Sequence, residues 1–87
     1  MVEEVLCTYS TPVHDSDGAV YLASAHGAPR ADGTWEAWLE FDSGDRLLAT
    51  PVESTQPDRQ ALVYWSGGIE PIYLEGAFRR AKDASAG

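Results

Sequence analysis

Trp38 stands between two carboxylates, Glu36 and Glu40, in a segment that alternates apolar and polar residues. A tryptophan ring flanked by acids could bind a cationic or aromatic ligand. The ring could equally pack beneath helices or against a cross-strand neighbour, because tryptophans are usually well buried. The two glutamates would lie about 13 Å apart along a strand, whereas the paired carboxylates of a glycosidase are ~5–9.5 Å apart. These residues are therefore candidates for ligand binding rather than for catalysis as a pair, although either glutamate could still pair with Glu53 or Asp45 from a neighbouring strand.

A second set of polar residues lies in segment 53–59, just before a segment with helical periodicity. Thr55 is well placed as an N-cap, and Pro57 and Asp58 suit the first turn of a helix. Backbone N–H groups and Arg59 at such a helix start could hold an anion, although the simpler role of these residues is capping, with Arg59 paired to Glu53 or Asp58. We therefore consider a small-molecule site between the strand face of Trp38 and this helix start. Its candidate residues are Glu36, Trp38, Glu40, Glu53, Gln56 and Arg59.

Metal ligands and nucleophiles are sparse in the chain. His14 precedes two aspartates, but the segment lacks the further oxygen ligands of a calcium loop. A zinc site would require His14, His26, Cys7 and an acid to converge, in a spacing that matches no established zinc pattern. Strand alternation places Cys7 on an apolar face, which favours a buried, inert thiol. The sequence thus predicts no metal, no cofactor and no catalytic residue.

The charge is strongly negative and unevenly distributed. The net charge is -8, and residues 1–58 hold eleven acidic and two basic side chains, against three and four in residues 59–87. Such a surface repels nucleic acids and anionic membranes, so neither is an expected partner. The single cysteine fits a reducing cytoplasm, and neither a membrane span nor a signal peptide is expected.

Strand-like alternation dominates the first half of the chain. Residues 34–42 are the clearest case, with Trp35, Ala37, Leu39 and Phe41 on one face. Residues 5–13, 19–25 and 46–52 are predicted as three further strands. Prolines 12 and 51 indicate edge strands or strand ends.

After Pro57, the spacing of the apolar residues changes from two residues to three or four. Ala61, Leu62 and Trp65 form one helical stripe that Gly67 and Gly68 end. A second helix is expected to open at Glu70 and Pro71, with the proline in its first turn and a buried stripe of Leu74, Ala77, Phe78 and Ala81. Residues 69–76 are also compatible with a fifth strand, which would close a small β-barrel with one helix. Val63, Tyr64 and Trp65 widen the apolar surface of the first helix and are predicted as interface residues.

Three segments of the chain resemble a group of small uncharacterised bacterial proteins. They are residues 35–41 (WEAWLEF), 53–65 (ESTQPDRQALVYW) and 73–81 (YLEGAFRRA). The similarity covers more than half of the chain and is weakest before Thr34. It implies a stand-alone bacterial module and assigns no catalytic residues.

Taken together, the patterns predict a single α+β domain over residues 1–87 with a disordered tail at 83–87. A four-stranded antiparallel meander should carry a C-terminal helical hairpin on one face. The expected function is a non-catalytic protein-interaction or homodimerisation module, and the alternative is a small-molecule-binding protein or minor enzyme with its site near Trp38 and Arg59. The predicted core consists of Val20, Leu22, Trp35, Leu39, Phe41, Leu48, Leu62, Trp65, Leu74 and Phe78.

Overall fold

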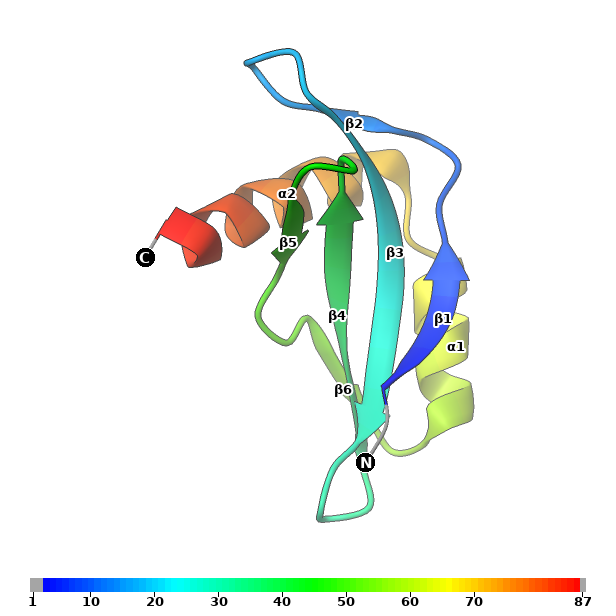
Figure 1. Cartoon of the computed structure of the whole chain (residues 1–87). Helices are drawn as coiled ribbons and strands as arrows, with labels where there is room; N and C mark the ends of the chain where they lie inside the picture. The colour runs from blue at the N-terminus through cyan, green and yellow to red at the C-terminus, as the bar shows by residue number, and fades with distance from the viewer. Residues whose placement is uncertain (1–2, 87) are drawn as a thin grey trace.

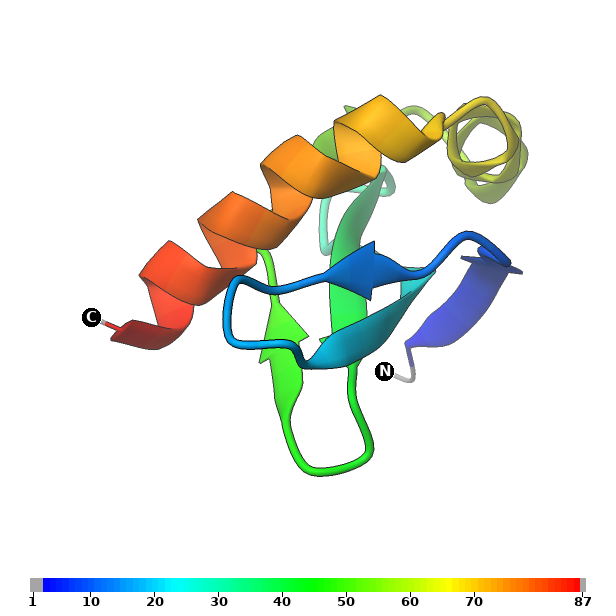
Figure 2. The same ribbon diagram turned by 90° about the horizontal axis from the view of Figure 1, so that it is seen from above.

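The computed structural model describes residues 3–86 and consists of an open antiparallel sheet with two C-terminal helices (Figure 1). Both helices cover the same face of the sheet, which Figure 2 shows from above. The α+β prediction is confirmed, and the closed barrel is excluded. The elements are β1 (Glu4–Thr8), β2 (Val13–His14), β3 (Val20–Pro29), β4 (Trp35–Asp42), β5 (Leu47–Ala49), β6 (Ser54–Gln56), α1 (Arg59–Gly67) and α2 (Pro71–Ala86).

The sheet has six strands where the sequence predicts four. The strand order is β1-β3-β4-β5. β2 pairs with the start of β3, next to the part that pairs with β1, and β6 pairs with the start of β4, next to the part that pairs with β5. The first predicted strand is divided into β1 and β2 by a segment containing Pro12, which has no N–H to donate. The fourth predicted strand ends early at Ala49, and a separate strand, β6, pairs with β4 from Ser54.

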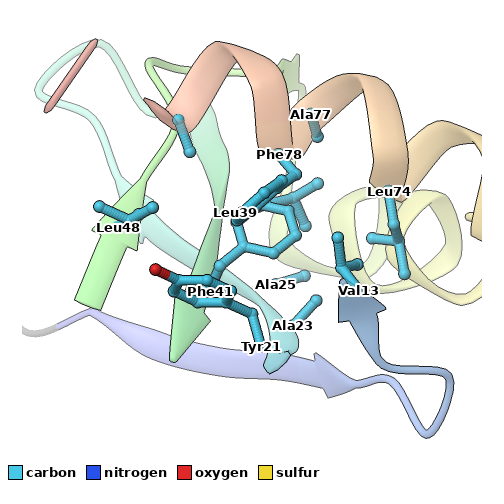
Figure 3. Packing of buried hydrophobic residues seen from close by; sticks show 11 residues of the cluster. Val13, Tyr21, Ala23, Ala25, Leu39, Phe41, Leu48, Leu74, Ala77 and Phe78 are labelled. Atoms are coloured by element: carbon cyan, nitrogen blue, oxygen red, sulfur yellow. The ribbon is translucent and has the colours of Figure 1, made fainter. Parts of the chain in front are cut away.

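The core lies between the β3–β4 hairpin and α2. Phe78 of α2 contacts two aromatic rings of the sheet, with centroids 4.9 Å from Tyr21 and 5.3 Å from Phe41 (Figure 3). The predicted inward face of β4 is confirmed, since Ala37, Leu39 and Phe41 are buried. The tilted and edge-on ring arrangements are those that aromatic pairs prefer.

The two β3 residues that the sequence predicts as core residues lie on the outer face of the sheet. Val20 and Leu22 are 46% and 57% exposed, whereas Tyr21, Ala23 and Ala25 are buried. Leu22 pairs with Asp42 and therefore shares the outer face of the sheet. The error arises because side-chain size favours valine and leucine as core residues. The inner face instead carries the large ring of Tyr21 beside the small Ala23 and Ala25, and Phe78 of α2 packs against Tyr21.

The N-cap of the first helix lies three residues later than the sequence predicts. Asp58 is the N-cap, and its carboxylate accepts a hydrogen bond from the Ala61 N–H at 2.9 Å. Thr55, the predicted cap, instead lies in β6 and pairs with Glu36. The backbone of β6 forms its hydrogen bonds with β4, so the helix starts only after the chain leaves the sheet. α1 packs closely on β3 because Gly27 lacks a Cβ, which would lie 3.3 Å from Leu62 Cδ1.

The second helix settles the assignment of residues 69–76, because α2 begins at Pro71 and contains Gly76. Its buried stripe is the predicted one: Leu74, Ala77, Phe78 and Ala81. The helix runs to Ala86 and so includes most of the segment that the sequence predicts as a disordered tail, while Gly87 lies outside the described residues. None of the helices within residues 3–86 has the length and apolar character needed to cross a membrane.

Candidate functional site

The helix-free face of the sheet carries a compact polar cluster on its two central strands. Ser24 and His26 of β3 lie opposite Glu40 and Trp38 of β4, respectively, in the antiparallel register. All four side chains face away from the helices, because they alternate with the buried alanines and Leu39. Ser24, His26, Trp38 and Glu40, together with Glu3, are called the sheet cluster below.

His26 is the centre of the sheet cluster. Its Nδ1 lies 2.8 Å from a carboxylate oxygen of Glu3, and its Nε2 lies 2.8 Å from the hydroxyl of Ser24. The Glu40 carboxylate is 3.4 Å from the same Nε2. Both nitrogens of a largely buried imidazole are therefore occupied by polar partners.

Trp38 packs beside a cross-strand neighbour, as one of the two sequence interpretations proposes. Its ring is nearly parallel to that of His26, with an interplanar angle of 16° and a centroid separation of 6.3 Å. Its indole N–H donates a hydrogen bond to Glu40 Oε2 at 2.9 Å. The tryptophan thus fixes the carboxylate that faces the histidine.

The six predicted ligand-binding residues do not line a common groove. Glu36, Trp38 and Glu40 lie on the helix-free face, whereas the other three lie on the side of the helices. Arg59 pairs with Glu4 at 3.0 Å, and Gln56 donates to Ser54 at 2.9 Å. The sheet itself separates these two groups, because neighbouring residues of a strand point to opposite faces.

Glu53 forms a structural clamp between the sheet and α2. Its carboxylate accepts two hydrogen bonds from Arg80, at 2.7 and 3.0 Å, and one from the Tyr73 hydroxyl at 2.7 Å. Burial opposes ionisation, but the Arg80 and Tyr73 hydrogen bonds outweigh it and hold the pKa of Glu53 below its usual value. Burial and the bond to Glu53 raise the pKa of the Tyr73 hydroxyl. Both oxygens of this carboxylate therefore bond to α2.

The other residues that the sequence analysis considers as metal ligands or as a nucleophile lie far from one another. His14 pairs with Val20, six residues along β3 from His26, which is about 20 Å at strand spacing. Cys7 pairs with Ala25 and packs, partly buried, against the core. Asp15, from the segment considered as a calcium loop, forms an ion pair with Lys82 at 2.7 Å, and the pKa of Asp15 is lowered by this contact.

Sequence reasoning missed Ser24 and Glu3 as members of the sheet cluster. A usable signal existed for Ser24, which lies two residues before His26 and therefore on the same face of a strand. No local pattern links Glu3 to His26, because the contact depends on the pairing of β1 with β3. A bulge between Val5 and Cys7 also disrupts the alternation at this end of β1.

The hydrogen-bond order Ser24, His26, Glu3 is that of a hydrolytic triad. Two observations argue against hydrolysis. Glu40 places a second carboxylate 3.4 Å from Nε2, where it would repel a developing oxyanion. In addition, β3 pairs with strands on both sides, so the backbone N–H groups around Ser24 serve the sheet.

The region where α1 meets α2 forms an exposed apolar surface. Tyr64 and Ile72 are 87% and 77% exposed, and Tyr73 is also accessible. Trp65 contacts Tyr73 edge to face, with centroids 6.4 Å apart, and this contact joins the two helices. We call Tyr64, Trp65, Ile72 and Tyr73 the elbow surface. It includes two of the three residues that the sequence predicts as an interface, Tyr64 and Trp65. Val63 lies about 160° around α1 from Trp65 and so faces away from α2.

Two shallow depressions flank Tyr64 on the elbow surface. One, of about 370 Å³, lies between the helices and is lined by Tyr64, Trp65, Gly68, Ile69, Glu70, Ile72 and Tyr73. The other, of about 560 Å³, lies toward β6 and is lined by Gln56, Asp58, Gln60, Ala61, Tyr64 and Trp65. A projecting aromatic ring and hollows that could receive one therefore occur side by side.

No protein-family model, curated protein or solved structure matches this chain. The observations that bear on function are therefore the two surfaces just described. The sheet cluster is polar and rich in metal-binding atom types, whereas the elbow surface is apolar and rich in aromatic residues.

Proposed function

We propose that the protein is a non-catalytic interaction domain that forms homodimers through the elbow surface. The observation that carries this proposal is Tyr64, a tyrosine with 87% of its surface exposed between two depressions. Tyrosine is enriched at the energetic centres of interfaces because it buries a large apolar area with few rotatable bonds.

The arrangement of the elbow surface suits a twofold axis. In a symmetric dimer one patch must be complementary to itself, so that a projection on each copy meets a hollow on the other. Tyr64 supplies the projection, and the depression beside Ile72 and Tyr73 supplies the hollow. The edge-to-face contact of Trp65 with Tyr73 orders the surface before binding, which lowers the entropy lost on association.

The charge distribution favours a second copy as the partner on this side. Residues 59–87 contain three acidic and four basic side chains, whereas residues 1–58 contain eleven and two. A dimer formed through the helices brings the nearly neutral parts together and keeps the acidic sheets apart. Contact between the sheets would bring the most negative parts of two chains together.

Sedimentation equilibrium of the wild type and of Tyr64→Ser tests the proposal. We expect the wild type to dimerise at micromolar to submillimolar concentration, because the surface is small. Since removal of a central interface tyrosine typically costs about 2 kcal/mol or more, and the substitution is present in both copies, Tyr64→Ser should weaken the dimer by about a thousandfold. The side chain is exposed, so the variant should fold as the wild type does.

Leu47→Ser is the matched control for this experiment. Leu47 is also a large exposed apolar residue, but it lies on β5 and pairs with Asp42 on the outer face of the sheet. The substitution should leave dimerisation unchanged. A wild type that stays monomeric throughout the dilution series, or a dimer that Leu47→Ser disrupts and Tyr64→Ser does not, would overturn the proposal.

A further inference from the structure

The sheet cluster combines the atom types and the spacing of a transition-metal site. Carboxylate oxygens of Glu3 and Glu40 and a ring nitrogen of His26 all lie within 4.8 Å of one another. Imidazole and carboxylate ligands together suit zinc and neighbouring divalent ions. This cluster lies on the helix-free face and is therefore independent of the elbow surface.

The charges of the cluster are unbalanced without a cation. Among residues 3–86, His26 is the only basic side chain within ion-pairing distance of either carboxylate. Even a protonated imidazole would offset only one of the two negative charges. Glu40 is mostly buried between Trp38 and His26, where solvent compensates its charge less well than at an open surface.

The distances assign different roles to the two glutamates. Glu3 accepts from Nδ1 at 2.8 Å, which directs the lone pair of a neutral His26 to Nε2. A carboxylate in this position is the usual orienting partner of a metal-binding histidine. On the other side, Glu40 Oε1 lies 3.4 Å from Nε2. Two atoms that each lie about 2.0–2.1 Å from a tetrahedral zinc ion are separated by about 3.3–3.4 Å.

We propose that His26 Nε2 and Glu40 Oε1 bind a divalent transition-metal ion such as Zn²⁺, with Glu3 as a positioning residue that holds the imidazole. Trp38 holds the other oxygen of Glu40 through its indole N–H at 2.9 Å, so this carboxylate presents one oxygen to the metal. The Ser24 hydroxyl, 2.8 Å from Nε2, would turn from the nitrogen to a water on the ion. Water completes the coordination, which makes the site open on its solvent side.

The test is calorimetric titration of tag-free, EDTA-treated protein with ZnCl₂, followed by visible spectra with Co²⁺ in place of zinc. We expect saturable binding of one ion per chain. His26→Gln should abolish it. Glu3→Gln should lower the affinity by about 10–100-fold without moving the Co²⁺ bands, as expected for an orienting residue. Glu40→Gln should weaken binding further and shift the bands, because a ligand atom is replaced.

Glu36→Gln is the matched control for charge. Glu36 lies on the same face of β4 as Glu40, but about 13 Å away at strand spacing, and its substitution removes the same negative charge. It should leave the affinity and the spectrum unchanged. Near-ultraviolet circular dichroism would verify folding, and if His26→Gln does not fold, the comparison of Glu40→Gln with Glu36→Gln decides. Absence of saturable binding, or equal weakening by those two substitutions, would overturn the proposal.

Discussion

Glu53 shows how one carboxylate can join two layers of a small domain. Only 6% of its side chain is exposed, and it receives hydrogen bonds from two α2 residues, Tyr73 and Arg80. The planar guanidinium contacts both carboxylate oxygens, and it also lies over the Tyr73 ring at 5.5 Å. Such bidentate, charge-assisted hydrogen bonds are stronger than neutral ones.

Glu53→Gln should therefore destabilise the fold, although glutamine keeps the size of the side chain. We expect a loss of about 1–2 kcal/mol in the free energy of unfolding, because Arg80 is half exposed and solvent screens part of the interaction. Urea denaturation measures the change. Glu75→Gln, an exposed substitution on α2 with the same change of charge, should have little effect. Equal stability of the two variants would contradict the role of the clamp.

The same clamp predicts a pH dependence. The pKa of Glu53 is lowered in the folded protein, so the unfolded chain takes up the proton first as the pH falls. The advantage of the wild type over Glu53→Gln should be complete above the ordinary glutamate value of about 4.3. It should decrease below that pH and vanish once the folded carboxylate is also protonated. Urea denaturation of both proteins between neutral and strongly acidic pH tests this dependence, and a constant difference would contradict it.

At the scale of single residues, the sequence identifies members of the sheet cluster but not their arrangement. Trp38 and Glu40 follow from strict alternation in one strand, which sequence can reveal. Their contacts with His26 depend on the register of β3 against β4, and the Glu3 contact depends on β1. Register is set by turns and by the burial of whole strands, so a local pattern does not disclose it.

At the scale of elements, long periodic segments are predictable and short paired ones are not. The alternation in β4 and the α2 stripe each repeat over several residues, and both are confirmed. β6 has three polar residues and exists because its backbone pairs with β4. No periodicity marks such a strand, so its residues are easily taken for the start of the following helix.

The boundary between β6 and α1 can be tested at the N-terminus of α1. Asp58→Ala removes the cap on the Ala61 N–H and should cost about 1 kcal/mol in the free energy of unfolding. Thr55→Ala changes an exposed residue of β6 and should cost less than about 0.5 kcal/mol. Thermal denaturation of both variants measures the difference. A larger loss for Thr55→Ala would place the helix start where the sequence predicts it.

At the scale of the whole molecule, the sheet and the helices differ in charge as well as in structure. The strand-rich part, residues 1–58, has eleven acidic and two basic side chains and is strongly negative, whereas the helical part is close to neutral. In the proposed dimer, the elbow surfaces meet and the acidic sheets lie at the outer ends, but each copy still carries a net charge of -8. Repulsion between the copies should therefore weaken the dimer without preventing it.

Salt should consequently strengthen self-association. Between about 0.01 and 0.15 M ionic strength, the Debye length shortens from about 30 to 8 Å, which screens the distant acidic sheets while leaving the apolar contact intact. We expect the dimer dissociation constant of the wild type to fall severalfold over this range in sedimentation equilibrium. Tyr64→Ser, with the same charge, should remain mostly monomeric at both ionic strengths. A dimer that weakens with salt would instead depend on attraction between opposite charges, which the near-neutral, largely apolar elbow surface does not supply.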